Sequence, residues 1–128
     1  MDANKYNVFA LAYLGDAIYE VAVRKYVLEH IKSSRADLMH KMGIGFVCAG
    51  AQAKAVKTML DEKFFTEEEE ALLRRARNHK IATKPKNADV MEYKWATAFE
   101  ALIGWLNLKE NLQRQEQVID RAIEILKK

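Results

Sequence analysis

Hydrophobic residues recur with helical spacing along most of the 128-residue chain. Apolar positions three and four residues apart predict α-helices, whereas alternation at every second position would predict strands. No stretch shows a convincing strand pattern, so the sequence predicts an all-α fold. We expect helices over about residues 8–29, 34–42, 47–61, 67–78, 91–108 and 112–126.

Local signals mark several of these helix ends. Thr66 begins a capping-box pattern, in which Thr66 caps the following helix and Glu69 reaches back. Ser34 offers an N-cap for the second helix. Gly43 and Gly45 predict a break between the second and third helices. The first helix is apolar on nearly all sides in its first half and amphipathic later, so we expect it to be a central helix.

Composition favours one folded domain. Half of the residues are hydrophobic and 30% are charged, which supports a core and argues against disorder. The length predicts a single domain over residues 1–128. The lone cysteine, Cys48, cannot form an internal disulfide and predicts a reducing compartment; its apolar surroundings predict burial. With neither a secretory signal nor a membrane-spanning run, we expect a cytoplasmic protein without membrane contact.

Two carboxylates stand in apolar surroundings. Asp16 is the only charged residue between positions 8 and 19, and Glu100 is the only one between 95 and 106. A buried, unpaired carboxylate costs several kcal/mol, so each side chain must reach solvent, pair with a cation or bind a metal. Either a narrow exposed stripe on each helix or one shared site accounts for both residues.

Two glycines favour the shared site. Gly15 precedes Asp16, and Gly104 lies one helical turn after Glu100. Glycine within a helix costs about 1 kcal/mol relative to alanine, and close approach of a second backbone is a common reason to keep it. If the two helices cross at these glycines, the two carboxylates converge. Such oxygen-rich sites suit Mg²⁺, or Mn²⁺ in its place.

Glu20 is a third candidate metal ligand. It lies four residues after Asp16 and therefore on the same helical face. The alternative is a surface ion pair with Arg24, which follows Glu20 by four residues. The three histidines and one cysteine, by contrast, have no zinc-ligand spacing.

The positive charge of the chain is concentrated in one segment. The net charge is only +3, yet residues 74–86 hold six cations and no acid, which leaves the remainder at −3. Such a segment is typical of binding to a phosphate backbone. A solvated helix end, where cations favour the dipole, explains its arginines but not its later lysines. The candidate contact residues are Arg74, Arg77, Asn78, Lys80, Lys84, Lys86 and Asn87.

Several motifs together resemble one known family. Residues 11–20, Leu-Ala-Tyr-Leu-Gly-Asp-Ala-Ile-Tyr-Glu, resemble the signature helix of the ribonuclease III catalytic domain. Residues 97–104, Thr-Ala-Phe-Glu-Ala-Leu-Ile-Gly, resemble its second acidic motif. With residues 65–70, Phe-Thr-Glu-Glu-Glu-Glu, and with Arg77-Asn78 and Pro85-Lys-Asn87, the whole pattern resembles the mini-ribonuclease III family. That bacterial form lacks a double-stranded-RNA-binding domain.

The resemblance implies an all-helical endonuclease domain that works as a homodimer on double-stranded RNA. Asp16 would be the signature aspartate and Glu100 the essential glutamate of a metal-dependent endoribonuclease. The implied substrate is a ribosomal RNA precursor, and a ribosomal protein is a candidate helper. Because no RNA-binding domain is expected in residues 1–128, the basic segment would supply the RNA contacts.

Two departures from the ribonuclease III pattern leave alternatives open. Typical members have a glutamate where this chain has Ala12 and an aspartate where it has Thr97. The number of metal ions and the groups completing their coordination therefore stay open. A non-catalytic RNA-binding module with the same fold is the first alternative. The second is a helical protein-interaction domain that uses apolar faces around Phe46 and Trp105.

Overall fold

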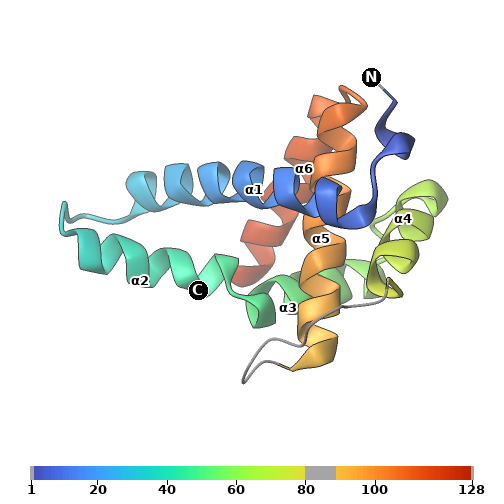
Figure 1. The fold of residues 1–128 in the computed structure, drawn as a ribbon. Helices are drawn as coiled ribbons and strands as arrows, with labels where there is room; N and C mark the ends of the chain where they lie inside the picture. Colours follow the sequence, from blue (N-terminus) through green and yellow to red (C-terminus); the bar gives the residue numbers. More distant parts are fainter. Residues whose placement is uncertain (1, 80–88, 128) are drawn as a thin grey trace.

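The structure is a computed structural model that describes residues 2–79 and 89–127. Within these residues the chain is helical, with no strand (Figure 1), which confirms the all-α prediction. A short 3₁₀ helix precedes six α-helices in the described part. The elements are η1 (Ala3–Lys5), α1 (Val8–His30), α2 (Ala36–Val47), α3 (Ala49–Asp61), α4 (Glu67–Arg77), α5 (Val90–Leu108) and α6 (Leu112–Leu126).

Helix α5 is the central helix of the fold. Its residues 96–106 are all buried except Glu100, which is partly buried. Helices α1, α3, α4 and α6 pack around it, and α1 makes the most extensive contact. None of the described helices combines the length and apolarity needed to cross a membrane.

The first helix also contributes to the core, as predicted, but it is less completely buried than α5. Helix α1 buries only one face against α5, and its opposite side exposes Tyr13, Val21 and Leu28. Its C-terminal half extends beyond α5 and lies beside α2, so the two helices project from the body as an arm (Figure 1). The apolar residues on all sides of α1 thus reflect a core face plus an exposed apolar face.

The two aromatic residues suggested as an interaction surface belong to the core. Phe46, near the end of α2, is buried, and its carbonyl oxygen accepts a hydrogen bond from the Tyr19 hydroxyl at 3.1 Å. Trp105 is also buried, and its indole N–H donates to Asn4 Oδ1 at 3.0 Å. A protein-interaction face centred on Phe46 and Trp105 is therefore contradicted.

The strongest capping signals locate helix ends correctly. The Thr66 hydroxyl accepts from the Glu69 N–H at 3.1 Å, and the Glu69 carboxylate accepts from the Thr66 N–H at 3.0 Å. This reciprocal pair is the predicted capping box. Helix α5 begins one residue earlier than expected because the Asp89 carboxylate caps it. Helix α6 has the bounds that its apolar spacing predicts.

The predicted boundaries of α2 are wrong at both ends. The N-cap is Arg35 rather than Ser34, and it makes no side-chain capping bond. The helix continues through Gly43 and Gly45, where an added Cβ would meet nothing within 4 Å. The break falls at Cys48, whose extended backbone (φ −66°, ψ 156°) joins α2 to α3. This position between two helices leaves Cys48 exposed rather than buried as predicted.

An ion pair between Glu69 of α4 and Arg114 of α6, largely buried, connects the two helices. The Glu69 carboxylate accepts two hydrogen bonds from the Arg114 guanidinium, at 2.8 and 2.9 Å. Arg114 also donates to the carbonyl oxygen of Phe64 at 2.8 Å. Burial alone would raise the pKa of Glu69, but the bonds from Arg114 and Thr66, with the charge of Arg114, hold that pKa below its usual value.

Candidate active site

Helices α1 and α5 cross with their backbones in contact. A Cβ added to Gly15 would lie 1.7 Å from the carbonyl oxygen of Glu100. A Cβ added to Gly104 would lie 2.0 Å from the carbonyl oxygen of Leu11. No side chain larger than hydrogen fits at either position, so the hypothesis of a crossing at the two glycines is confirmed.

The crossing brings Asp16 and Glu100 together. Burial is the main reason that the pKa of Glu100 rises from its usual 4.5 to about 8. The charge of Asp16, a hydrogen bond between the two acidic side chains and the more distant charge of Glu20 raise it further, while a hydrogen bond from Gln52 opposes them. Asp16 itself is exposed, so the pair reaches from the partly buried Glu100 to solvent.

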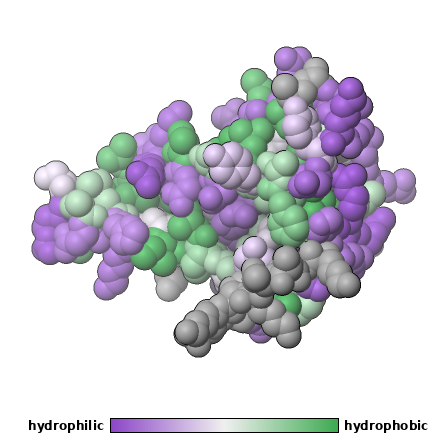
Figure 2. Space-filling view, viewed as in Figure 1, coloured by the Kyte–Doolittle hydropathy of each residue, from purple (hydrophilic) through white to green (hydrophobic). Residues whose placement is uncertain are grey.

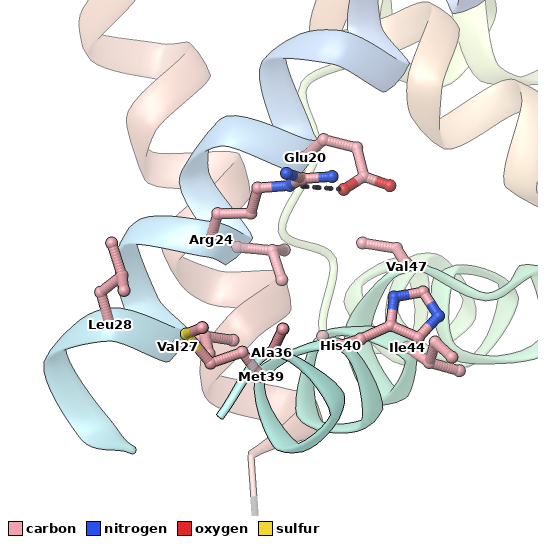
Figure 3. Close-up of a pocket in the computed structure, with 11 residues that line it drawn as sticks. Glu20, Arg24, Val27, Leu28, Ala36, Met39, His40, Ile44 and Val47 are labelled. Atoms are coloured by element: carbon pink, nitrogen blue, oxygen red, sulfur yellow. Dashed lines mark ion pairs between the residues drawn. The ribbon is translucent and has the colours of Figure 1, made fainter. Parts of the chain in front are cut away.

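Glu20 does not join this pair as a third member of a cluster. Its carboxylate forms an ion pair with Arg24 at 3.6 Å (Figure 3). Across the part of the chain that the structure describes, no three His, Cys, Asp or Glu side chains are grouped so that they could hold a metal ion. The surface ion pair considered for Glu20 is therefore present, beside a two-carboxylate site.

Gln52 of α3 is the residue near this site that the sequence analysis missed. Its side chain is buried, and its Nε2 atom donates to Glu100 Oε2 at 3.3 Å and to the carbonyl oxygen of Val47 at 3.0 Å. The available signal is its register, because Gln52 falls on the buried face that also contains Val56 and Met59. A polar residue at a core-facing position needs a partner inside the protein.

The donor set fits a hard divalent cation. Asp16 and Glu100 supply carboxylate oxygens, and the Gln52 Oε1 atom is buried with no hydrogen-bond partner among the described residues. Mg²⁺ prefers oxygen ligands and is commonly held by one or two carboxylates while keeping several waters. Two carboxylates beside an unpartnered amide oxygen are compatible with that preference.

The positions that carry acids in typical ribonuclease III supply none here. Ala12 and Thr97 are both buried. The Thr97 hydroxyl donates to the carbonyl oxygen of Tyr93 at 3.0 Å, within its own helix. Neither residue therefore adds a negative charge to the site.

The described part of the basic segment lies at the end of α4. Arg74 is near Glu70, at 4.0 Å, so the acid that precedes the segment partly balances it. The Arg77 guanidinium lies over the Trp95 ring at 5.0 Å and donates to Asn78 Oδ1 at 3.0 Å. Lys80, Lys84, Lys86 and Asn87 fall outside the described residues.

A largely apolar groove of about 400 Å³ lies between α1 and α2 (Figure 3). Val27, Met39 and Ile44 line it, and the Glu20–Arg24 ion pair lies at its edge. In the space-filling view, hydrophobic residues on the surface of the arm lie among hydrophilic ones (Figure 2). The groove therefore belongs to the arm, and neither Asp16 nor Glu100 lines it.

Comparison with known proteins agrees with this fold and assigns the chain to a family. Residues 10–111 match the sequence profile of the Ribonuclease III domain. The chain is 42% identical to Mini-ribonuclease 3 of Enterococcus faecalis, over 95% of this chain and 92% of the relative. It is 38% identical to Mini-ribonuclease 3 of Streptococcus pneumoniae, over 97% and 96%.

A solved structure shows the same fold. The crystal structure of a Fusobacterium nucleatum protein matches with a TM-score of 0.82 and 34% sequence identity, over 96% of each chain. The chain therefore belongs to the ribonuclease III family of endoribonucleases. Within that family it falls with the mini-ribonuclease 3 proteins, as the sequence resemblance indicated.

Proposed function

We propose that this protein cleaves double-stranded RNA by metal-dependent phosphodiester hydrolysis at Asp16 and Glu100. The observation that carries the proposal is the crossing of α1 and α5 at Gly15 and Gly104, which holds the two carboxylates together. The Mini-ribonuclease 3 relatives support the reaction class.

The two acids have distinct environments and complementary roles. Asp16, on the exposed side, meets solvent and the RNA phosphate first, whereas Glu100 provides a partly buried anchor for the cation. When bound, Mg²⁺ or Mn²⁺ supplies activation of water and neutralisation of charge on the phosphate. Glu20 becomes an additional ligand if its carboxylate leaves Arg24. Because the pKa of Glu100 is about 8, cation binding releases a proton and strengthens with rising pH.

The RNA is held through its backbone. A-form RNA hides its bases in a deep major groove, so phosphates and 2′-hydroxyls are the accessible groups. The basic segment formed by Arg74, Arg77, Asn78, Lys80, Lys84, Lys86 and Asn87 supplies these contacts. In this proposal the RNA contacts come from the ribonuclease III domain itself.

The active form is a homodimer. Helix α1 exposes Tyr13, Val21 and Leu28, and α2 exposes Ile44, so these two helices offer apolar side chains to a second copy. Tyr13 is 85% exposed and lies one helical turn before Asp16. Two copies related by a two-fold axis present two acid pairs, one for each RNA strand. Sedimentation at micromolar concentration tests this point, and a monomer would contradict it.

We place the reaction in ribosomal RNA precursor maturation in the cytoplasm, with a ribosomal protein as candidate helper. This assignment rests on the resemblance of residues 11–20 and 97–104 to the motifs of the mini-ribonuclease III family. Incubation with a precursor transcript, with and without bound ribosomal proteins, tests it. One defined cut in a duplex region is expected, whereas degradation of unrelated duplexes at the same rate would contradict a dedicated precursor.

The central experiment measures cleavage of duplex RNA with Mg²⁺ and with a chelator. The parent protein should cut only with Mg²⁺, and Asp16→Asn should lower kcat by about 100-fold or more because one metal ligand is lost. Asp120→Asn is a matched control, since Asp120 is an exposed acid on α6. RNA binding without cleavage, equal in the parent and in Asp16→Asn, would favour the non-catalytic RNA-binding module instead.

A second experiment tests the RNA surface. Replacing Lys84 and Lys86 with alanine should weaken RNA binding and reduce the salt slope by about 1 for each lost phosphate contact. The control removes two cations elsewhere, Arg121 and Lys127, which form ion pairs with Glu62 and Glu124. Equal losses in both double variants would show that only net charge matters, and unchanged affinity would exclude these lysines as contacts.

A further inference from the structure

Gln52 connects three helices at the acidic site. It lies in the first turn of α3, its Nε2 atom reaches the last carbonyl of α2 at Val47, and the same nitrogen reaches Glu100 of α5. The carbonyl of Val47 is one of the helix-end groups that have no partner within α2. Gln52 satisfies that group and, with the other hydrogen of the same amide, contacts the carboxylate.

The geometry fixes which way round the amide lies. A backbone carbonyl oxygen can only accept, so the group 3.0 Å from Val47 O must be the amide nitrogen. The opposite orientation would place the amide oxygen against both the carbonyl and Glu100. Gln52 is only 1% exposed, so water does not compete for these bonds. Gln52 therefore donates to Glu100 Oε2, and Glu100 is held as an acceptor.

This arrangement leaves the other polar atom of Gln52 without compensation. Its Oε1 is the buried side-chain oxygen with no hydrogen-bond partner among the described residues. An orphaned buried acceptor is costly, and such groups concentrate where function requires them. A leucine would fill the position without that cost. Retention of an amide here points to a role in the site and not to packing alone.

We propose that Gln52 is a positioning residue of the nuclease, which orients the Glu100 carboxylate so that its remaining lone pairs face the divalent cation. This inference rests on the proposed function of Asp16 and Glu100. Gln52 engages Oε2 and leaves the remaining acceptor sites of the carboxylate for the metal. A neutral amide does this without adding negative charge. Because Ala12 and Thr97 supply no acids, metal binding depends more strongly on the orientation of the Asp16 and Glu100 carboxylates.

The test compares Gln52→Leu with Gln115→Leu. Gln115 also makes a side-chain amide bond, accepting from Asn107 at 2.9 Å, but it lies on α6 away from the acids. Binding of Mn²⁺ to each folded variant is measured without RNA by electron paramagnetic resonance, and cleavage is measured against Mg²⁺ concentration. Loss of a residue that orients a metal ligand typically weakens metal affinity by about 10- to 100-fold.

We expect Gln52→Leu to bind Mn²⁺ about 10-fold more weakly, to need correspondingly more Mg²⁺ for half-maximal cleavage, and to keep the RNA KM of the parent. Gln115→Leu should match the parent in all three. If Gln52→Leu fails to fold, Gln52→Asn replaces it, because the shorter amide cannot reach Val47 and Glu100 together. Mn²⁺ affinity within about twofold of the parent, in either folded variant, would overturn the proposal.

The same data separate this inference from the proposed function. If the parent binds no Mn²⁺ and cuts no RNA, the proposal for Asp16 and Glu100 fails, and that for Gln52 fails with it. If the parent binds Mn²⁺ and Glu100→Gln abolishes that binding while the Gln52 variants do not weaken it, only the role of Gln52 is overturned.

Discussion

Glu69 and Glu100 are both at least partly buried, but the pKa of Glu69 is lowered and that of Glu100 is raised. Glu69 is buried between α4 and α6, and its pKa lies below the usual value because Arg114 and Thr66 outweigh the cost of burial. Glu100 lies at the α1–α5 crossing, and burial together with Asp16 raises its pKa to about 8. The bonding capacity of Glu69 is filled from within the chain, whereas that of Glu100 is filled only in part. The difference separates a structural carboxylate from one kept for an external cation.

The largest effect is expected from removing the contact that places Glu100 beside Asp16. Gly15→Ala would put a methyl group into the backbone of α5, so we expect loss of the folded state or of more than about 4 kcal/mol of stability. Gly45→Ala is the control, since its Cβ meets nothing and alanine favours the helix by about 1 kcal/mol. Urea unfolding measures both. A Gly15→Ala variant as stable as the parent would show that the two helices can separate.

The second experiment asks whether only one of the two glutamates serves the reaction. Glu100→Gln should lower kcat by about 100-fold or more, because a charged metal ligand becomes a neutral amide. Glu69→Gln should keep the parent kcat within about twofold at temperatures where it is folded, since Glu69 contacts Arg114 and not the site. Steady-state cleavage with Mg²⁺ measures both. Comparable losses in the two variants would remove the distinction between the glutamates.

For the free energy of unfolding we expect the reverse order, with a larger loss for Glu69→Gln than for Glu100→Gln. Glu69→Gln leaves Arg114 without its bidentate carboxylate, and we expect a loss of about 2 kcal/mol, below the range for fully buried pairs because Arg114 is partly exposed. Replacement of both partners, Glu69→Leu with Arg114→Met, should cost less than Glu69→Gln alone. Urea unfolding at neutral pH measures these variants. A change below about 0.5 kcal/mol for Glu69→Gln would mean that the pair adds no net stability.

The last prediction concerns how the stability depends on pH without divalent ions. Glu100 binds a proton more tightly in the folded chain, with a pKa of about 8, than at its usual value of 4.5. Its contribution is thus fully present below about pH 4.5 and is lost as pH rises to about 8. Glu100→Gln should flatten this dependence and leave the chelated protein more stable than the parent at pH 8, because the neutral amide carries no charge to bury. Thermal unfolding checks this, and identical pH profiles would contradict the raised pKa.

Much of the acidic site could be predicted because its signals are strong in sequence. A single acid within a dozen otherwise uncharged residues must reach solvent, pair with a cation or bind a metal, and this reasoning singled out Asp16 and Glu100. The adjacent glycines indicated the crossing. Gln52 was not predicted because a neutral amide in a helix is ordinary in sequence, and only the structure shows that it is buried. Its contact with Glu100 joins residues 48 positions apart.

Helix boundaries were likewise predictable where the signal is local in the sequence and not where tertiary packing decides. The capping box at Thr66 predicted the start of α4 because both bonds are local. Gly43 and Gly45 misled the prediction for α2, because packing of Phe46 and its neighbours against the body outweighs the helix cost of two glycines. The actual break, at Cys48, has no glycine or proline to mark it.

The contact between Gly15 and Gly104 also bears on how the core can be repacked. The distance between the helices that carry the two acids is set by main-chain atoms, with no side chain in between whose size could vary. Repacking of side chains elsewhere in the core leaves this main-chain contact in place. The separation of the two helices is therefore a property of the backbone and not of the packing around it.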